Sequence, residues 1–76
     1  MNAVEAQEVK SLLLRQDSHY RELAEQHHQL DDRLHELTEK HYLSTSEQLE
    51  ETTLKKRKLA LKDQMEEMAR NFADHH

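Results

Sequence analysis

Cysteine, proline, glycine and tryptophan are all missing from these 76 residues. The lack of cysteine excludes disulfides and thiol chemistry. The lack of glycine and proline removes the usual markers of tight turns and strand ends. Aromatic residues are scarce too, with two tyrosines and one phenylalanine. The chain must therefore be built from elements that need neither tight turns nor aromatic clusters.

Long hydrophobic runs are also missing. The longest apolar cluster is Leu12-Leu13-Leu14, far short of the roughly 20 residues needed to span a bilayer. Residues 1–10 lack the basic-then-apolar order of a secretion signal. These absences predict a cytoplasmic protein that does not associate with membranes.

The residues that are present favour long, exposed helices. Charged residues make up 36% of the chain and apolar residues 34%, and the common types, such as Glu, Gln, Leu and Lys, are good helix formers. This balance is typical of helices with narrow apolar seams rather than a thick core. The net charge of −5 disfavours a general nucleic-acid binder.

Two stretches of apolar residues follow heptad spacing, with alternating steps of four and three. One runs from Val9 to His41 and the other from Leu54 to Phe72. Such spacing keeps one stripe of a helix facing a partner helix. If the chain folds back near Ser44, the matched pairs are Leu34–Leu54, His27–Leu61, Leu23–Met65 and Tyr20–Met68. The predicted interface and core residues are Leu13, Tyr20, Leu23, His27, Leu30, Leu34, Leu54, Leu61, Met65, Met68 and Phe72.

The sequence thus predicts one all-α domain over residues 1–76, an antiparallel, coiled-coil-like helical hairpin. Its arms span residues 18–42 and 46–72, and a short extra helix spans residues 3–16. Ser44 and Glu47 form a predicted capping box at the start of the second arm. Asp17 and Ser18 offer N-cap side chains to the first arm. A break at Asp17 and one uninterrupted helix through it both fit the sequence.

The two arms carry patterns that resemble a known family. The first arm reads Tyr20-x-x-Leu23-x-x-x-His27-x-x-Leu30-Asp31-x-x-Leu34, and the second reads Leu54-Lys55-Lys56-Arg57-Lys58-Leu59-Ala60-Leu61-Lys62-Asp63-x-Met65. Together they resemble the signature of the YdcH-like proteins, which are short bacterial helical hairpins of unassigned function. The resemblance covers residues 20–68 and implies a bacterial origin. It implies no substrate, cofactor or mechanism.

Histidines are the residues most open to a chemical interpretation. His28, Asp32 and His35 share one helical face and could hold a metal ion, but the second arm offers no further His or Cys between Leu49 and Phe72. A solvated polar face is the favoured interpretation, so no metal or cofactor is expected. His27 lies in the apolar seam, where a single polar residue can fix the alignment of two helices.

The basic run from Lys55 to Lys62 is the one concentration of positive charge. We name Lys55, Lys56, Arg57, Lys58 and Lys62 the basic collar. Pairing with acidic residues of the first arm, such as Asp31 and Asp32, is the favoured interpretation. Contact with the phosphates of a nucleic acid is the alternative, and it would be strongly salt-dependent.

The leading functional hypothesis is a non-enzymatic structural or adaptor protein that acts through helix–helix contacts. A thin hairpin encloses no pocket in which an acid, a base or a nucleophile could be positioned. A lone hairpin also leaves apolar residues uncovered. We therefore expect a homodimer or tetramer in which residues 4–14 contribute, an unidentified protein partner, and no small-molecule substrate. The alternative hypothesis is a nucleic-acid-associated regulator that uses the basic collar.

Overall fold

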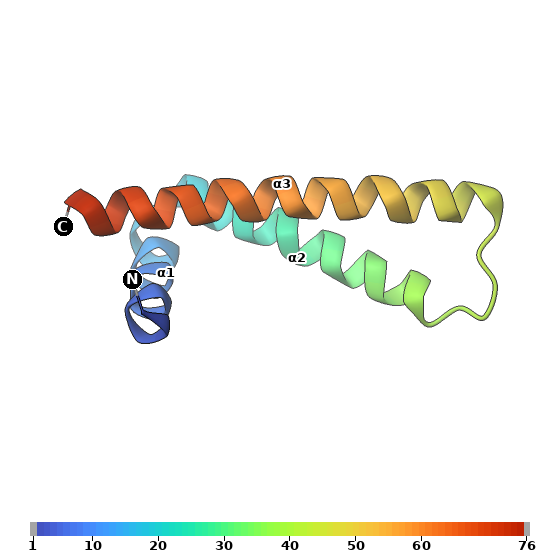
Figure 1. The fold of residues 1–76 in the computed structure, drawn as a ribbon, viewed down its shortest axis with the longest axis horizontal. Helices are drawn as coiled ribbons and strands as arrows, with labels where there is room; N and C mark the ends of the chain where they lie inside the picture. Colours follow the sequence, from blue (N-terminus) through green and yellow to red (C-terminus); the bar gives the residue numbers. More distant parts are fainter. Residues whose placement is uncertain (1, 76) are drawn as a thin grey trace.

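The computed structural model describes residues 2–75 and contains three helices (Figure 1). Helix α1 spans Ala3–Gln16, α2 spans Ser18–Thr38 and α3 spans Thr45–His75. Helices α2 and α3 run antiparallel as the two arms of a hairpin, and α1 lies across their base. The predicted all-α hairpin with an extra N-terminal helix is therefore confirmed.

A sharp corner at Asp17 separates α1 from α2, which decides between the two interpretations of this segment. Asp17 has an extended backbone, with φ −114° and ψ 110°. Its carboxylate accepts a hydrogen bond from the backbone N–H of Tyr20 at 3.0 Å, as an N-cap should. Arg21 donates to the last carbonyls of α1, those of Leu14 and Arg15, at 3.2 and 3.0 Å. One residue thus caps α2 while a second satisfies the end of α1.

Helix α2 ends at Thr38, short of the predicted arm end at residue 42. The Thr38 hydroxyl donates to the Leu34 carbonyl at 2.9 Å, and the Lys40 N–H donates to the Leu37 carbonyl at 3.2 Å. His41, which continues the heptad pattern in the sequence, consequently lies exposed in the connecting loop. The chain leaves the helix before it turns back, and Leu43 of the connecting loop packs against the buried leucines of this region.

Helix α3 begins at the predicted capping box. The Glu47 N–H donates to the Ser44 hydroxyl at 3.2 Å, and the Ser44 N–H donates to the Glu47 carboxylate at 3.1 Å. Two backbone donors that a helix start would otherwise leave unpaired are therefore satisfied reciprocally. The capping box is confirmed, and the helix extends beyond residue 72 to His75.

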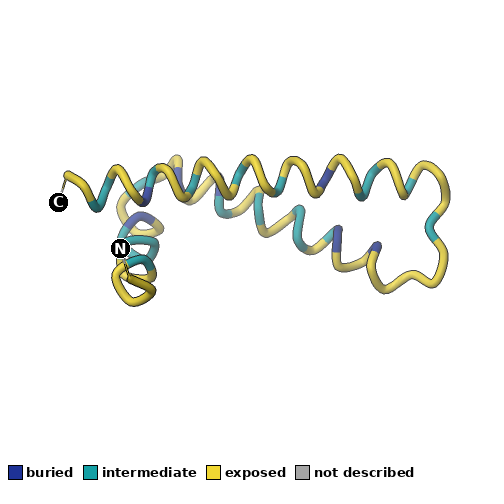
Figure 2. Tube along the Cα trace, viewed as in Figure 1, coloured by how far each residue is buried: buried dark blue, intermediate teal, exposed yellow. Residues whose placement is uncertain are grey.

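Apart from Leu23, the buried apolar residues of the described chain fall into two clusters, and Figure 2 shows buried positions toward both ends of the hairpin. We call the first the base cluster; it contains Leu13, Tyr20 and Ala69, with Val9, Met65, Met68 and Phe72 packed against it. The second, the turn cluster, contains Leu34, Leu37 and Leu54, with Leu30 and Leu43 packed against it. Two of the matched pairs, Leu34–Leu54 and Tyr20–Met68, each fall within one cluster, as the heptad alignment predicts.

The middle of the hairpin is less enclosed than its ends. Leu23 is buried there, but His27 and Leu61 are only half-buried. Leu59 is 60% exposed. Two helices in contact along one stripe cannot cover the sides of that stripe, so the seam stays open wherever no third element packs against it.

Candidate functional site

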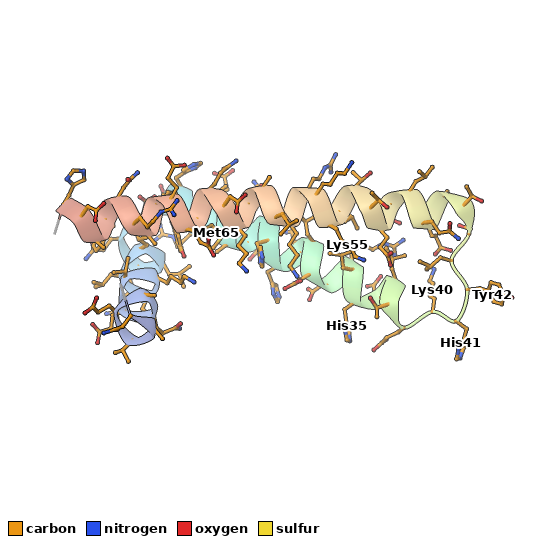
Figure 3. The ribbon with its side chains drawn as sticks, in the orientation of Figure 1. His35, Lys40, His41, Tyr42, Lys55 and Met65 are labelled. Atoms are coloured by element: carbon orange, nitrogen blue, oxygen red, sulfur yellow. The ribbon has the colours of Figure 1, made fainter. Side chains whose placement is uncertain are left out.

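An open groove of about 800 Å³ runs along one side of the hairpin. Helix α2 forms one wall and α3 forms the other. We call it the α2–α3 groove, and it is lined by His28, Asp31, Asp32, Leu34, His35, Thr38, Lys55, Lys58, Leu59 and Lys62. Leu34 and Leu59 supply its apolar part, and Figure 3 shows His35 and Lys55 on its two helices.

The two walls of the groove carry opposite charge. Among the Asp, Glu, Lys and Arg residues that line the groove, α3 contributes Lys55, Lys58 and Lys62, and α2 contributes Asp31 and Asp32. Lys58 joins the walls by an ion pair with Asp31 at 2.5 Å. The hydrogen bond from this lysine holds the pKa of Asp31 below its usual range.

Two further ion pairs connect the arms near the turn. Arg33 donates from two of its nitrogens to both carboxylate oxygens of Glu50, each at 2.8 Å. It also pairs with Glu36 at 3.0 Å. These hydrogen bonds raise the pKa of Arg33 and lower that of Glu50. The bidentate geometry fixes the relative position of the two helices.

The second of these pairs joins Lys40 to Glu47. The hydrogen bond from Lys40, reinforced by the backbone N–H of Ser44, lowers the pKa of Glu47 to about 2. Glu47 therefore serves both the capping box and the ion pair across the turn.

The Arg33–Glu50 pair was not anticipated from the sequence. Both residues flank the Leu34–Leu54 match, where opposite charges beside a coiled-coil seam commonly pair between helices. Two opposite charges beside a matched apolar pair are therefore the sequence feature from which this ion pair could have been predicted.

The members of the basic collar separate into two groups. Lys58 pairs with Asp31 of the first arm, as the favoured interpretation expects, and Lys55 pairs with Glu51 of its own helix at 3.5 Å. Within residues 2–75, Lys56, Arg57 and Lys62 form no ion pair. The collar is therefore only partly used to join the arms.

The histidines on the α2 face pair locally with carboxylates. His28 lies 3.5 Å from Asp32, and His35 lies 3.0 Å from Glu39. In the described part of the chain, no group of three or more His, Cys, Asp or Glu side chains is placed to hold a metal ion. The helix facing His28 and His35 across the groove presents lysines, which would repel a cation.

His27 lies on a different, smaller depression, with Tyr20 and Met65 as apolar neighbours. The charged residues around it are Lys10, Lys58, Lys62 and Glu66. His27 is half-buried, and its expected role in fixing the alignment of the two arms stays a prediction.

A second depression between α2 and α3 has no acidic residue in its lining. It has a volume of about 350 Å³ and is lined by Gln26, Gln29, Leu30, Arg57, Ala60 and Leu61. The linings of the two depressions therefore differ, because that of the α2–α3 groove carries charges of both signs, whereas the second carries one charged residue, Arg57.

Helix packing and open grooves define the class of this molecule as a small helical-hairpin protein. Residues 21–69 match the family described as a protein of unknown function, DUF465, and the chain belongs to that family. No curated protein and no solved structure matches the chain. The family match agrees with the expectation of an uncharacterised helical family, and the narrower likeness to the YdcH-like proteins stays an expectation.

Within residues 2–75, none of the helices combines the length and the apolar character needed to cross a membrane.

Proposed function

We propose that this protein is a non-enzymatic structural or adaptor protein that works through helix–helix contacts with itself and with a protein partner. The observation that carries the proposal is the apolar surface that the three helices leave uncovered. Leu59 is 60% exposed in the middle of α3, and Leu14 is 43% exposed at the end of α1. Each lies on a helix that packs against the other two helices along a different stripe, so a further helix is the element that would cover them.

Sedimentation equilibrium tests the self-association. We expect a homodimer or tetramer at micromolar concentration, and a monomer over that range would contradict this part of the proposal. Leu12→Lys with Leu14→Lys tests the contribution of residues 4–14 and should lower the assembly state while helicity is retained. Leu49→Lys is the matched control, because Leu49 is 67% exposed on a part of α3 that lines neither groove.

A nuclease-controlled pull-down tests the partner. An adaptor should retain its protein partner whether or not the lysate is treated with nuclease, because the contacts are between helices. Recovery of the partner from untreated lysate alone would argue against an adaptor.

A nucleic-acid-associated regulator is the second candidate function. The observation that favours it is that Lys56, Arg57 and Lys62 form no ion pair within residues 2–75, which leaves these cations available to phosphates. Lys55→Glu with Lys56→Glu should then abolish retention of nucleic acid at low salt. Under the adaptor proposal, the same change should leave recovery of the protein partner largely intact.

A further inference from the structure

The separation of charge across the α2–α3 groove selects one way for two copies of this chain to pack together. The inference rests on the proposed self-association and names its surface. One wall presents Lys55 and Lys62, and the other presents Asp32. Leu59, between these lysines on α3, is 60% exposed, so the face offers apolar surface flanked by unlike charges.

Two symmetric arrangements would place this face against itself. If the two-fold axis lies across the helices, α3 packs on α3 of the second copy and α2 packs on α2. The lysine walls then meet each other, and so do the aspartate walls, which is unfavourable. If the axis lies along the helices, α3 packs on α2 of the second copy. The lysine wall then meets the aspartate wall twice, once in each direction.

We propose that a second copy of this chain packs on the α2–α3 groove with both turns at the same end. The two hairpins form a four-helix bundle in which every helix is antiparallel to both neighbours. Leu59 of each copy is enclosed between α2 and α3 of the other. Because the interface is isologous, every favourable contact occurs twice.

The Asp31–Lys58 pair sets the level at which the charges meet. It places this turn of α2 beside the middle of the basic collar on α3. In the proposed arrangement the two-fold axis is parallel to the helices, so equivalent residues of the two copies lie at the same height along the bundle. Asp32 of the second copy therefore falls beside the turn of α3 from Lys55 to Leu59. The link between Asp32 and His28 of the same chain is exposed and 3.5 Å long, so Asp32 is free to turn toward a lysine.

A mixing experiment tests the arrangement without depending on any single variant. Lys55→Glu alone places two carboxylates together at each of the two contacts, and Asp32→Lys alone places two lysines there. We expect each variant to weaken its own dimerisation by tenfold or more. In an equimolar mixture the two chains should form a heterodimer, because Glu at position 55 then meets Lys at position 32, and Lys55 meets Asp32. Native mass spectrometry distinguishes the species by mass.

Lys56→Glu is the matched control for the mixture. Lys56 adjoins Lys55 but does not line the groove, so its variant should not form the heterodimer with Asp32→Lys. Circular dichroism of each of the three variants should show unchanged helicity, because positions 32, 55 and 56 are all exposed. Equal heterodimer formation by Lys56→Glu and Lys55→Glu would overturn the assigned contact.

Spin labelling tests the direction of packing. The chain has no cysteine, so Tyr42→Cys gives one label per copy at a position that is 90% exposed in the turn. With both turns at one end, the distance between labels should be well short of the 47 Å length of the molecule. A distance near or beyond that length would place the turns at opposite ends and overturn the proposal.

The two proposals fail in different ways. A wild-type chain that remains monomeric defeats the proposed self-association, and the arrangement falls with it. A wild-type dimer whose variants do not form the heterodimer leaves self-association standing and defeats the assigned face alone.

Discussion

The base and the turn end of the hairpin are held together by different means. At the base, α1 packs across both arms and encloses Tyr20 and Ala69, which are 1% and 2% exposed. At the turn end only two helices meet, and Leu43 of the loop covers part of the cluster. Ion pairs flank that end, from Arg33 to Glu50 and from Lys40 to Glu47. A third helix thus covers the apolar cluster at the base, whereas a loop residue covers part of the cluster at the turn end and ion pairs join the arms beside it.

This difference teaches what a two-helix contact lacks. One stripe against one stripe buries few side chains, since each helix shields only one side of the other. At the base, α1 covers the apolar side chains that the two arms leave exposed. At the turn end, the loop covers part of them, and in the middle of the hairpin no third element covers them. The proposed second copy would cover that middle region.

The largest expected effect is at the base. Tyr20→Ala removes a ring that three helices enclose, and truncations of this kind cost about 3–5 kcal/mol of unfolding free energy. Urea unfolding followed by circular dichroism measures the loss. Tyr42→Ala is the control, because its ring is 90% exposed and exposed changes usually stay within about 0.5 kcal/mol. Equal effects at the two tyrosines would contradict the described base cluster.

A smaller loss is expected at the turn end. Leu37 is 1% exposed, but its surroundings include a loop that can partly close the space left by truncation. Leu37→Ala should therefore cost about 2 kcal/mol, near the lower limit for buried leucines. Thermal unfolding of this variant beside Tyr20→Ala compares the two ends directly. A larger loss at Leu37 than at Tyr20 would reverse the comparison.

The middle of the hairpin should respond in the opposite direction. His27→Leu replaces a half-buried polar ring in the seam, so it should raise the unfolding free energy by about 1 kcal/mol, as for polar seam residues that trade stability for alignment. Thermal unfolding measures the gain, and sedimentation shows whether assembly becomes less uniform. A loss of stability would show that His27 makes a hydrogen bond that matters more than its apolar surroundings.

The smallest effect concerns acid, and it should be confined to the turn end. The pKa of Glu47 is lowered to about 2 and that of Glu50 is lowered as well. A carboxylate whose pKa is depressed by folding stabilises the fold above its unfolded pKa, near 4.5 for Glu47, and this contribution is lost as the pH falls towards the folded value. Hydrogen exchange should show loop protection falling between these values before the base opens. Glu47→Gln should flatten the change, whereas Glu22→Gln should not.

The candidate groove was only partly predictable from the sequence. The basic collar and its acidic counterparts are visible as residues, and the pairing of Lys58 with Asp31 follows from the hairpin alignment. The placement of the lysines and aspartates on opposite walls of the groove depends on the rotation of each helix about its axis, which the sequence alone does not give. Ala69 shows the same limit at the base, because a small residue between apolar heptad positions gives no signal until a third helix packs on it.

By itself, the sequence determined the helices, their antiparallel pairing and the start of α3. Helix formation depends on local propensity, capping at Ser44 is local as well, and heptad spacing specifies which stripe meets which. Only the tertiary structure decided where α2 ends, how α1 lies across the base and which faces stay open. Those outcomes depend on contacts between side chains that are distant in the sequence. A periodic pattern along one helix does not specify such contacts.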